Sequence, residues 1–180
     1  MANTYVPIAT VTVGSSGATD VTFSSIPGTY TDLVIRYSAT TNDTGAVTWT
    51  KLTFNGSTSG YSDRYLRGTG DIVTSGTDGS SSSGAAAFGG AVRSTATASG
   101  WVTPIVHGNV EIYIPNYAGS NNKSFGIDGV LENNSTYTHL SFIAGVWSNS
   151  SAITSININA TSTFKFQQYS TFTLYGIKNS

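Results

Sequence analysis

Apolar and polar side chains alternate along most of this 180-residue chain, as they do in β-strands that have one face in a core. The segment 31–40 shows the pattern clearly, because Leu33 and Ile35 fall on the same face of an extended chain. The closing segment 170–178 repeats it around Phe172. We expect these two segments to be partner strands of the core, with the C-terminal one held firmly in a sheet.

Turn-forming residues break the alternation about every eight to twelve residues, a spacing typical of sandwich and barrel strands. Asn55-Gly56 predicts a tight turn, and Ile26-Pro27-Gly28-Thr29 predicts a type II turn with Gly28 at positive φ. We expect strands at 5–13, 19–23, 31–40, 46–54, 61–66, 88–95, 101–107, 109–114, 123–131, 138–146, 153–159, 163–166 and 171–177. The pattern predicts an all-β chain folded as a jelly-roll-like two-sheet β-sandwich.

The length fits one domain, so we expect residues 1–180 to form a single β-sandwich. The alternation fails in a Gly/Ser/Ala-rich region at about 68–100. Two interpretations of this region compete: a long exposed loop, or small-residue strands packed closely in an oligomer. We favour a loop over 75–87 followed by a short strand.

Composition narrows the classes of partner. Only 9% of residues are charged, against roughly 25% in an average soluble domain, and eight Lys and Arg nearly balance nine Asp and Glu. We therefore expect no nucleic-acid partner and no membrane partner. The chain has no cysteine, and its N-terminus lacks the basic and apolar segments of an export signal, so we expect it to be assembled in a cytoplasm.

The groups that catalysis needs are few. His107 and His139 are the only histidines, and Gly56-Ser57-Thr58-Ser59-Gly60 has threonine where a hydrolase elbow needs its nucleophile. A glycosidase would need two carboxylates placed together. The carboxylates considered for such a pair are Asp63, Asp71, Glu111 and Glu132. Because nothing marks a pair, we expect no enzyme, no catalytic residue and no cofactor, and we expect Asp63, Arg64 and Arg67 to pair at the surface.

Metal-binding patterns are equally sparse. Two histidines without close spacing, in a chain without cysteine, do not form a zinc motif. Calcium stays open at Asn42 and Asp43 or at Asp71 and Asp78, although no EF-hand pattern occurs there. We predict no metal site.

Aromatic residues give carbohydrate binding some support, because sugar rings stack on exposed aromatic faces. The alternative is that aromatics in strands belong to the core or to a subunit interface. Tyr117 and Tyr137 lie beside Asn and Ser in predicted loops, where packing explains them least. They are therefore the candidates for contact with a glycan or a protein partner.

Five motifs distributed over the chain carry a resemblance. They are YVPIAT at 5–10, TFSSIPGTYTDL at 22–33, NYAGSNNKS at 116–124, SSAITSI at 150–156 and STFTLYGIK at 170–178. Together they resemble a family of small structural proteins of tailed bacteriophages, similar to head-decoration or tail-fibre components. The resemblance implies a place in a virion and no enzymatic activity.

From the resemblance and the single domain we expect a capsid decoration (cement) protein on the particle exterior. We expect a homo-oligomer, a trimer, that docks on the major capsid protein or another virion protein. The alternative is a tail-fibre or tail-appendage module that binds a receptor or a host-surface glycan. A fibre usually needs a shaft or adaptor domain, and the predicted single domain favours decoration.

Overall fold

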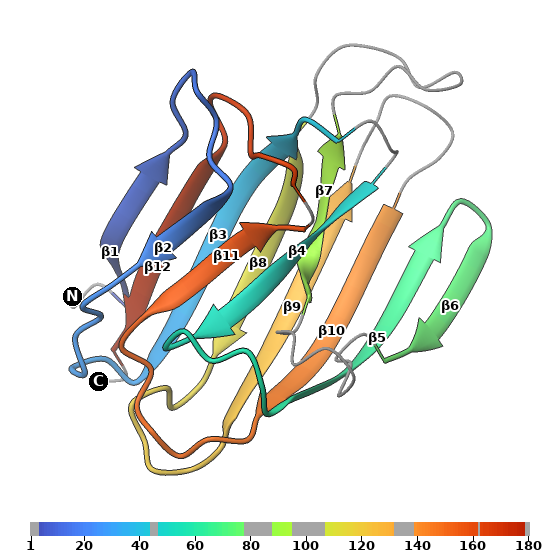
Figure 1. Ribbon diagram of the computed structural model, residues 1–180. Helices are drawn as coiled ribbons and strands as arrows, with labels where there is room; N and C mark the ends of the chain where they lie inside the picture. The colour runs from blue at the N-terminus through green and yellow to red at the C-terminus, as the bar shows by residue number, and fades with distance from the viewer. Residues whose placement is uncertain are drawn as a thin grey trace.

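The computed structural model describes residues 4–43, 47–77, 88–94, 107–131, 139–161 and 163–178, with the backbone alone for 88–94. The described residues form twelve strands and no helix (Figure 1). The strands are β1 (Tyr5–Thr12), β2 (Asp20–Phe23), β3 (Asp32–Thr41), β4 (Val47–Phe54), β5 (Tyr61–Thr69), β6 (Ile72–Gly76), β7 (Phe88–Ser94), β8 (Gly108–Ile114), β9 (Lys123–Leu131), β10 (His139–Trp147), β11 (Ile156–Ala160) and β12 (Thr171–Ile177).

The strands form two layers. The larger sheet has eight antiparallel strands in the order β1-β12-β3-β8-β9-β10-β5-β6. The smaller sheet has the order β2-β11-β4, with β7 beside β4. A short parallel contact between β7 and the end of β3 links the two sheets. Figure 1 shows the smaller sheet lying across one face of the larger one, which confirms the predicted all-β two-sheet sandwich.

The predicted partnership of the two core strands is confirmed. β12 lies between β1 and β3, and Leu174 faces Ile35 across the β12–β3 ladder. Both side chains are fully buried, as is Phe172. The C-terminal strand is therefore held by neighbours on both sides.

The inner faces of the two sheets form the core. Its buried aromatic centre contains Phe54, Tyr61, Phe125 and Trp147, with ring centroids 5.7 to 6.1 Å apart in the contacting pairs. The Phe125 ring fills the space that a side chain at Gly145 would need. The Tyr61 hydroxyl accepts a hydrogen bond from the backbone N–H of Phe54 at 2.7 Å, so this cluster has no unsatisfied phenol.

Three local predictions need correction. Gly28 does not take a positive φ; the positive value in that loop belongs to Ser25, at 54°. The segment 163–166 is not a strand, since Phe166 makes only isolated bridges. The loop predicted at 75–87 is wrong at 75 and 76, because these residues belong to β6, which pairs with β5 in a hairpin. Positions 78–87 of that loop lie outside the described residues, and the short strand predicted at 88–95 is confirmed as β7. The predicted strand at 101–107 lies outside the described residues except for His107.

Tyr117 is wrong as a candidate surface contact, because its side chain is fully buried. Its hydroxyl donates a hydrogen bond to the backbone oxygen of Pro27 and accepts one from the N–H of Tyr30 at 3.4 Å. Tyr117 therefore joins the β8–β9 connection to the β2–β3 connection, although its Asn and Ser neighbours suggested a surface loop. Tyr137, the other candidate, lies outside the described residues.

We expect Tyr117→Phe to lower the free energy of unfolding by about 1 to 2 kcal/mol, because the Pro27 oxygen loses its buried donor while the ring still fills its site. Urea denaturation measures the change. Tyr169→Phe is the matched control, since Tyr169 is exposed and should lose less than about 0.5 kcal/mol. Equal stability of both variants would contradict a structural role for the Tyr117 hydroxyl.

Candidate binding face

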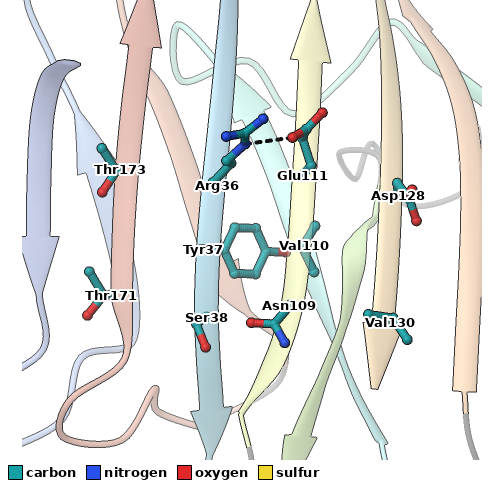
Figure 2. Close-up of a pocket in the computed structure, with 10 residues that line it drawn as sticks. All are labelled: Arg36, Tyr37, Ser38, Asn109, Val110, Glu111, Asp128, Val130, Thr171 and Thr173. Carbon is teal, nitrogen blue, oxygen red and sulfur yellow. Dashed lines mark hydrogen bonds and ion pairs between the residues drawn. The ribbon is translucent and has the colours of Figure 1, made fainter. Parts of the chain in front are cut away.

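The outer face of the larger sheet points away from the smaller sheet and carries two kinds of surface. At its centre Arg36, Glu111 and Asp128 lie in one row, directly opposite one another on β3, β8 and β9. Arg36 Nε lies 2.6 Å from Glu111 Oε2 in an ion pair whose side chains are 54% and 44% exposed. Figure 2 shows this pair with Asp128 on the neighbouring strand.

These charged groups border a shallow hollow of about 470 Å³. Its other polar side chains come from β12, β3 and β8. They are Ser38, Asn109, Thr171 and Thr173 (Figure 2). We call this set, with Arg36, Glu111 and Asp128, the polar hollow. Val110 and Val130 line the hollow as well, so it offers hydrogen-bond donors and acceptors beside apolar surface.

An apolar strip lies beside the polar hollow on the same face. The register places Val130 opposite Leu140 and Phe142 opposite Leu66. Leu140 leans over Gly68, whose partner on β6 is Val73. These apolar side chains are between 40% and 71% exposed. A contiguous exposed apolar surface of this kind marks a site of contact with another molecule.

Sequence reasoning missed the apolar strip, although β10 carries the signal for it. Phe142 and Leu140 alternate with Ile143 and the other inward residues, so the strand is apolar on both faces. An apolar composition on both faces is typical of strands in sheets that are covered on both sides. One side of β10 is covered by the protein's own core.

The two histidines do not form a catalytic pair. His107 precedes β8 and His139 begins β10, with β9 between these strands. His139 Nδ1 lies 2.9 Å from the hydroxyl of Thr69, where a triad histidine needs a carboxylate. The buried Nε2 of His139 and the buried Oγ of Ser141 have no hydrogen-bond partner among the described residues.

The carboxylates considered for hydrolysis are dispersed. Asp63 is buried on the inner face of β5, and Asp71 is exposed in the β5–β6 turn. Glu111 does face Asp128, but its carboxylate is engaged in the ion pair with Arg36. Glu132 lies outside the described residues.

The predicted surface pairing around Asp63 is wrong, because alternation places Asp63 and Arg67 on the inner face and Arg64 on the outer face. The Arg67 guanidinium lies between two aromatic rings, 3.8 Å from the centroid of Trp49 and 3.7 Å from that of Tyr65. This stacking stabilises the cation at the end of the sandwich.

Asn42 and Asp43, one of the two pairs considered for calcium, are engaged in other contacts. The side-chain oxygen of Asn42 accepts a hydrogen bond from the N–H of Lys165, and Asp43 accepts one from the hydroxyl of Thr48. In the described part of the chain no three His, Asp or Glu side chains are grouped for a metal ion. Asp78, the partner considered for Asp71, lies outside that part.

Comparisons with protein-family models, with curated proteins and with solved structures gave no match to this chain. Within the described ranges no helix is long and apolar enough to cross a membrane.

The stability of the fold should fall on acidification through His139. Burial, with the nearby Arg67 charge, lowers the pKa of His139 below its ordinary value of about 6.5. Near pH 6.5 His139 therefore binds a proton in the unfolded chain but not in the folded chain. As a result, the free energy of unfolding falls as the pH drops below that value. We expect His139→Asn, which can still bond to Thr69, to lose less stability than the wild type between pH 7 and pH 5 in urea denaturation.

His107→Asn is the control for this measurement. Burial lowers the pKa of His107 as well. The variant His107→Asn leaves His139 in place, and it should therefore keep the acid sensitivity that His139 contributes. Identical pH profiles for the wild type and His139→Asn would rule out His139 as a source of the acid sensitivity.

Proposed function

We propose that this protein is a non-enzymatic structural component of a bacteriophage virion, a decoration protein that docks on the exterior of the capsid. The observation that carries the proposal is the apolar strip on the outer face of the larger sheet, formed by Leu66, Val73, Val130, Leu140 and Phe142. The resemblance of the sequence motifs to phage structural proteins supplies the kind of particle.

The outer face of the larger sheet suits docking on another protein better than it suits catalysis. Burying apolar area contributes about 25 cal/mol per Å², and it does so without any particular reactive group. Many copies on a symmetric shell can each make a modest contact of this kind and still coat the particle stably. The low charge of the chain also limits the desolvation that docking would cost.

A reconstruction of the intact virion tests the location. Decoration requires density for this chain at regular positions on the capsid lattice, with the apolar strip against the major capsid protein. Density at the tail alone would overturn the decoration proposal.

Phe142→Lys should weaken docking on particles that lack the protein by about tenfold or more, because the contact would bury an unpaired charge. Phe142 is exposed in the free chain, so the free energy of unfolding should change by less than about 0.5 kcal/mol. Thr22→Lys, on the exposed side of the smaller sheet, is the control that should dock as the wild type does. Co-sedimentation with the particles measures binding, and equal docking of both variants would exclude the apolar strip as the contact.

The polar hollow favours a second candidate, a tail-appendage module that binds a host-surface glycan. Tyr113 is exposed next to the hollow, and its hydroxyl donates a hydrogen bond to Asp32 at 2.8 Å, which holds the ring in place for stacking. On a glycan array, Asn109→Ala and Asp128→Ala should then lose binding that Phe142→Lys retains. An array without wild-type binding would exclude the glycans it displays.

A further inference from the structure

The hairpin of β5 and β6 ends the larger sheet on one side. Gly70 and Asp71 form its two-residue turn, with Gly70 at a φ of 58°, as a type II′ turn requires at its first central position. Among the described strands β6 pairs with β5 alone. Ile72 and Val73 are 55% and 71% exposed, and Figure 1 shows β6 at the rim, beyond the strands of the smaller sheet.

Among the described edge strands, β1 and β2 are protected against pairing and β6 is not. β1 contains Pro7 and a register shift between Pro7 and Ala9, two devices that prevent the addition of a strand. β2 is only four residues long and begins with Asp20. The sequence of β6, Ile-Val-Thr-Ser-Gly, has no proline and no charge. An apolar, uncharged edge of this kind is a template for another strand.

The hairpin register determines which backbone groups of β6 face outward. Thr69 and Ile72 close the two-residue turn, so they exchange hydrogen bonds with each other. Bonding then alternates along the ladder, and Thr74 also bonds toward β5. The N–H and C=O groups of Val73 and Ser75 therefore point away from β5, in the plane of the sheet.

We propose that β6 pairs with β6 of a second copy of this chain, antiparallel about a twofold axis at Thr74. This register places Val73 opposite Ser75 of the second copy, and Ser75 opposite Val73 of the second copy. Each of these two pairs joins outward-facing groups only, so each exchanges both of its hydrogen bonds. The edge is thus complementary to itself, as a twofold interface must be. The pairing does not depend on the proposed place in a virion.

The side chains agree with this register. Thr74 meets Thr74 of the second copy in a close pair, and threonine pairs across antiparallel strands are favourable. Val73 lies on the outer face, as its partner Gly68 does, so the apolar strip continues from one copy into the next. No charged side chains of β6 face each other, because β6 has none. The contact is short, so we expect a dimer that dissociates on dilution.

A twofold pair differs from the trimer that the sequence predicts. A trimer joins unlike surfaces in a ring, whereas the β6 edge matches itself. Sedimentation velocity of the full chain over a range of concentrations distinguishes the two. We expect a monomer–dimer equilibrium in the wild type.

Ser75→Pro removes one outward N–H and leaves the bonds between β5 and β6 intact, so it should shift the chain to monomer. Ser75→Ala is the matched control, because it keeps the N–H and should dimerise as the wild type does. Circular dichroism melting of both variants verifies that they fold.

Because the chain has no cysteine, a single introduced thiol tests the register directly. Thr74→Cys should form a disulfide-linked dimer under mild oxidation, since Cα atoms of such a pair lie about 4.5 Å apart, within disulfide range. Thr12→Cys, on the exposed edge strand β1, is the collisional control. We expect it to cross-link more slowly, because no pairing of β1 strands holds its thiols within disulfide range.

A monomer at every concentration, or a trimer, would overturn the pairing. A dimer that Ser75→Pro leaves unchanged would also overturn it, as would equal cross-linking rates of Thr74→Cys and Thr12→Cys.

Discussion

The larger sheet must bury one complete face, and the smaller sheet that covers it has fewer strands. Leu33, Ile35, Ile112 and Ile127 on the inner face become fully or almost fully buried because β11, β4 and β2 lie across them. Once the smaller sheet is used in this way, no described strand remains to cover the opposite face. The apolar strip and the open β6 edge are two results of the same unequal division of strands.

The hydroxyl-rich composition also contributes inside the sandwich. The Tyr37 hydroxyl lies 2.9 Å from that of Thr50, and the hydroxyls of Thr41 and Thr48 lie 2.8 Å apart, all four residues being buried. Hydroxyls that pair with one another satisfy buried polar atoms without introducing a charge. The chain can therefore connect its sheets with hydrogen bonds while keeping its proportion of charged residues low.

Alternation predicted most of the strands because a period of two is a local property of the sequence. It placed Phe172 in the core and joined β12 to β3 correctly. It could not find β6, whose five residues include two small or hydroxyl-bearing ones and a glycine, and whose pairing depends on the turn at Gly70. It also placed Tyr117 at the surface, since the burial of that ring depends on distant loops that only the fold brings together.

The candidate face was beyond sequence reasoning for a related reason. Arg36, Glu111 and Asp128 are far apart along the chain, and only the register of β3, β8 and β9 puts them in one row. The apolar strip was detectable in principle from β10, which is apolar on both sides. Without the strand order, however, nothing in the sequence indicates which side the smaller sheet covers.

The position of β12 also determines when the domain can be completed during translation. β12 separates β1 from β3, and residues that meet across the β1–β12 ladder, such as Thr10 and Thr173, are 163 positions apart. Every other described strand precedes β12 in the chain, and β1 pairs with β12 alone among the described strands, so β1 lacks this partner until β12 emerges from the ribosome. A nascent chain therefore keeps an incomplete larger sheet, and the finished outer face becomes available for assembly only after β12 has joined it.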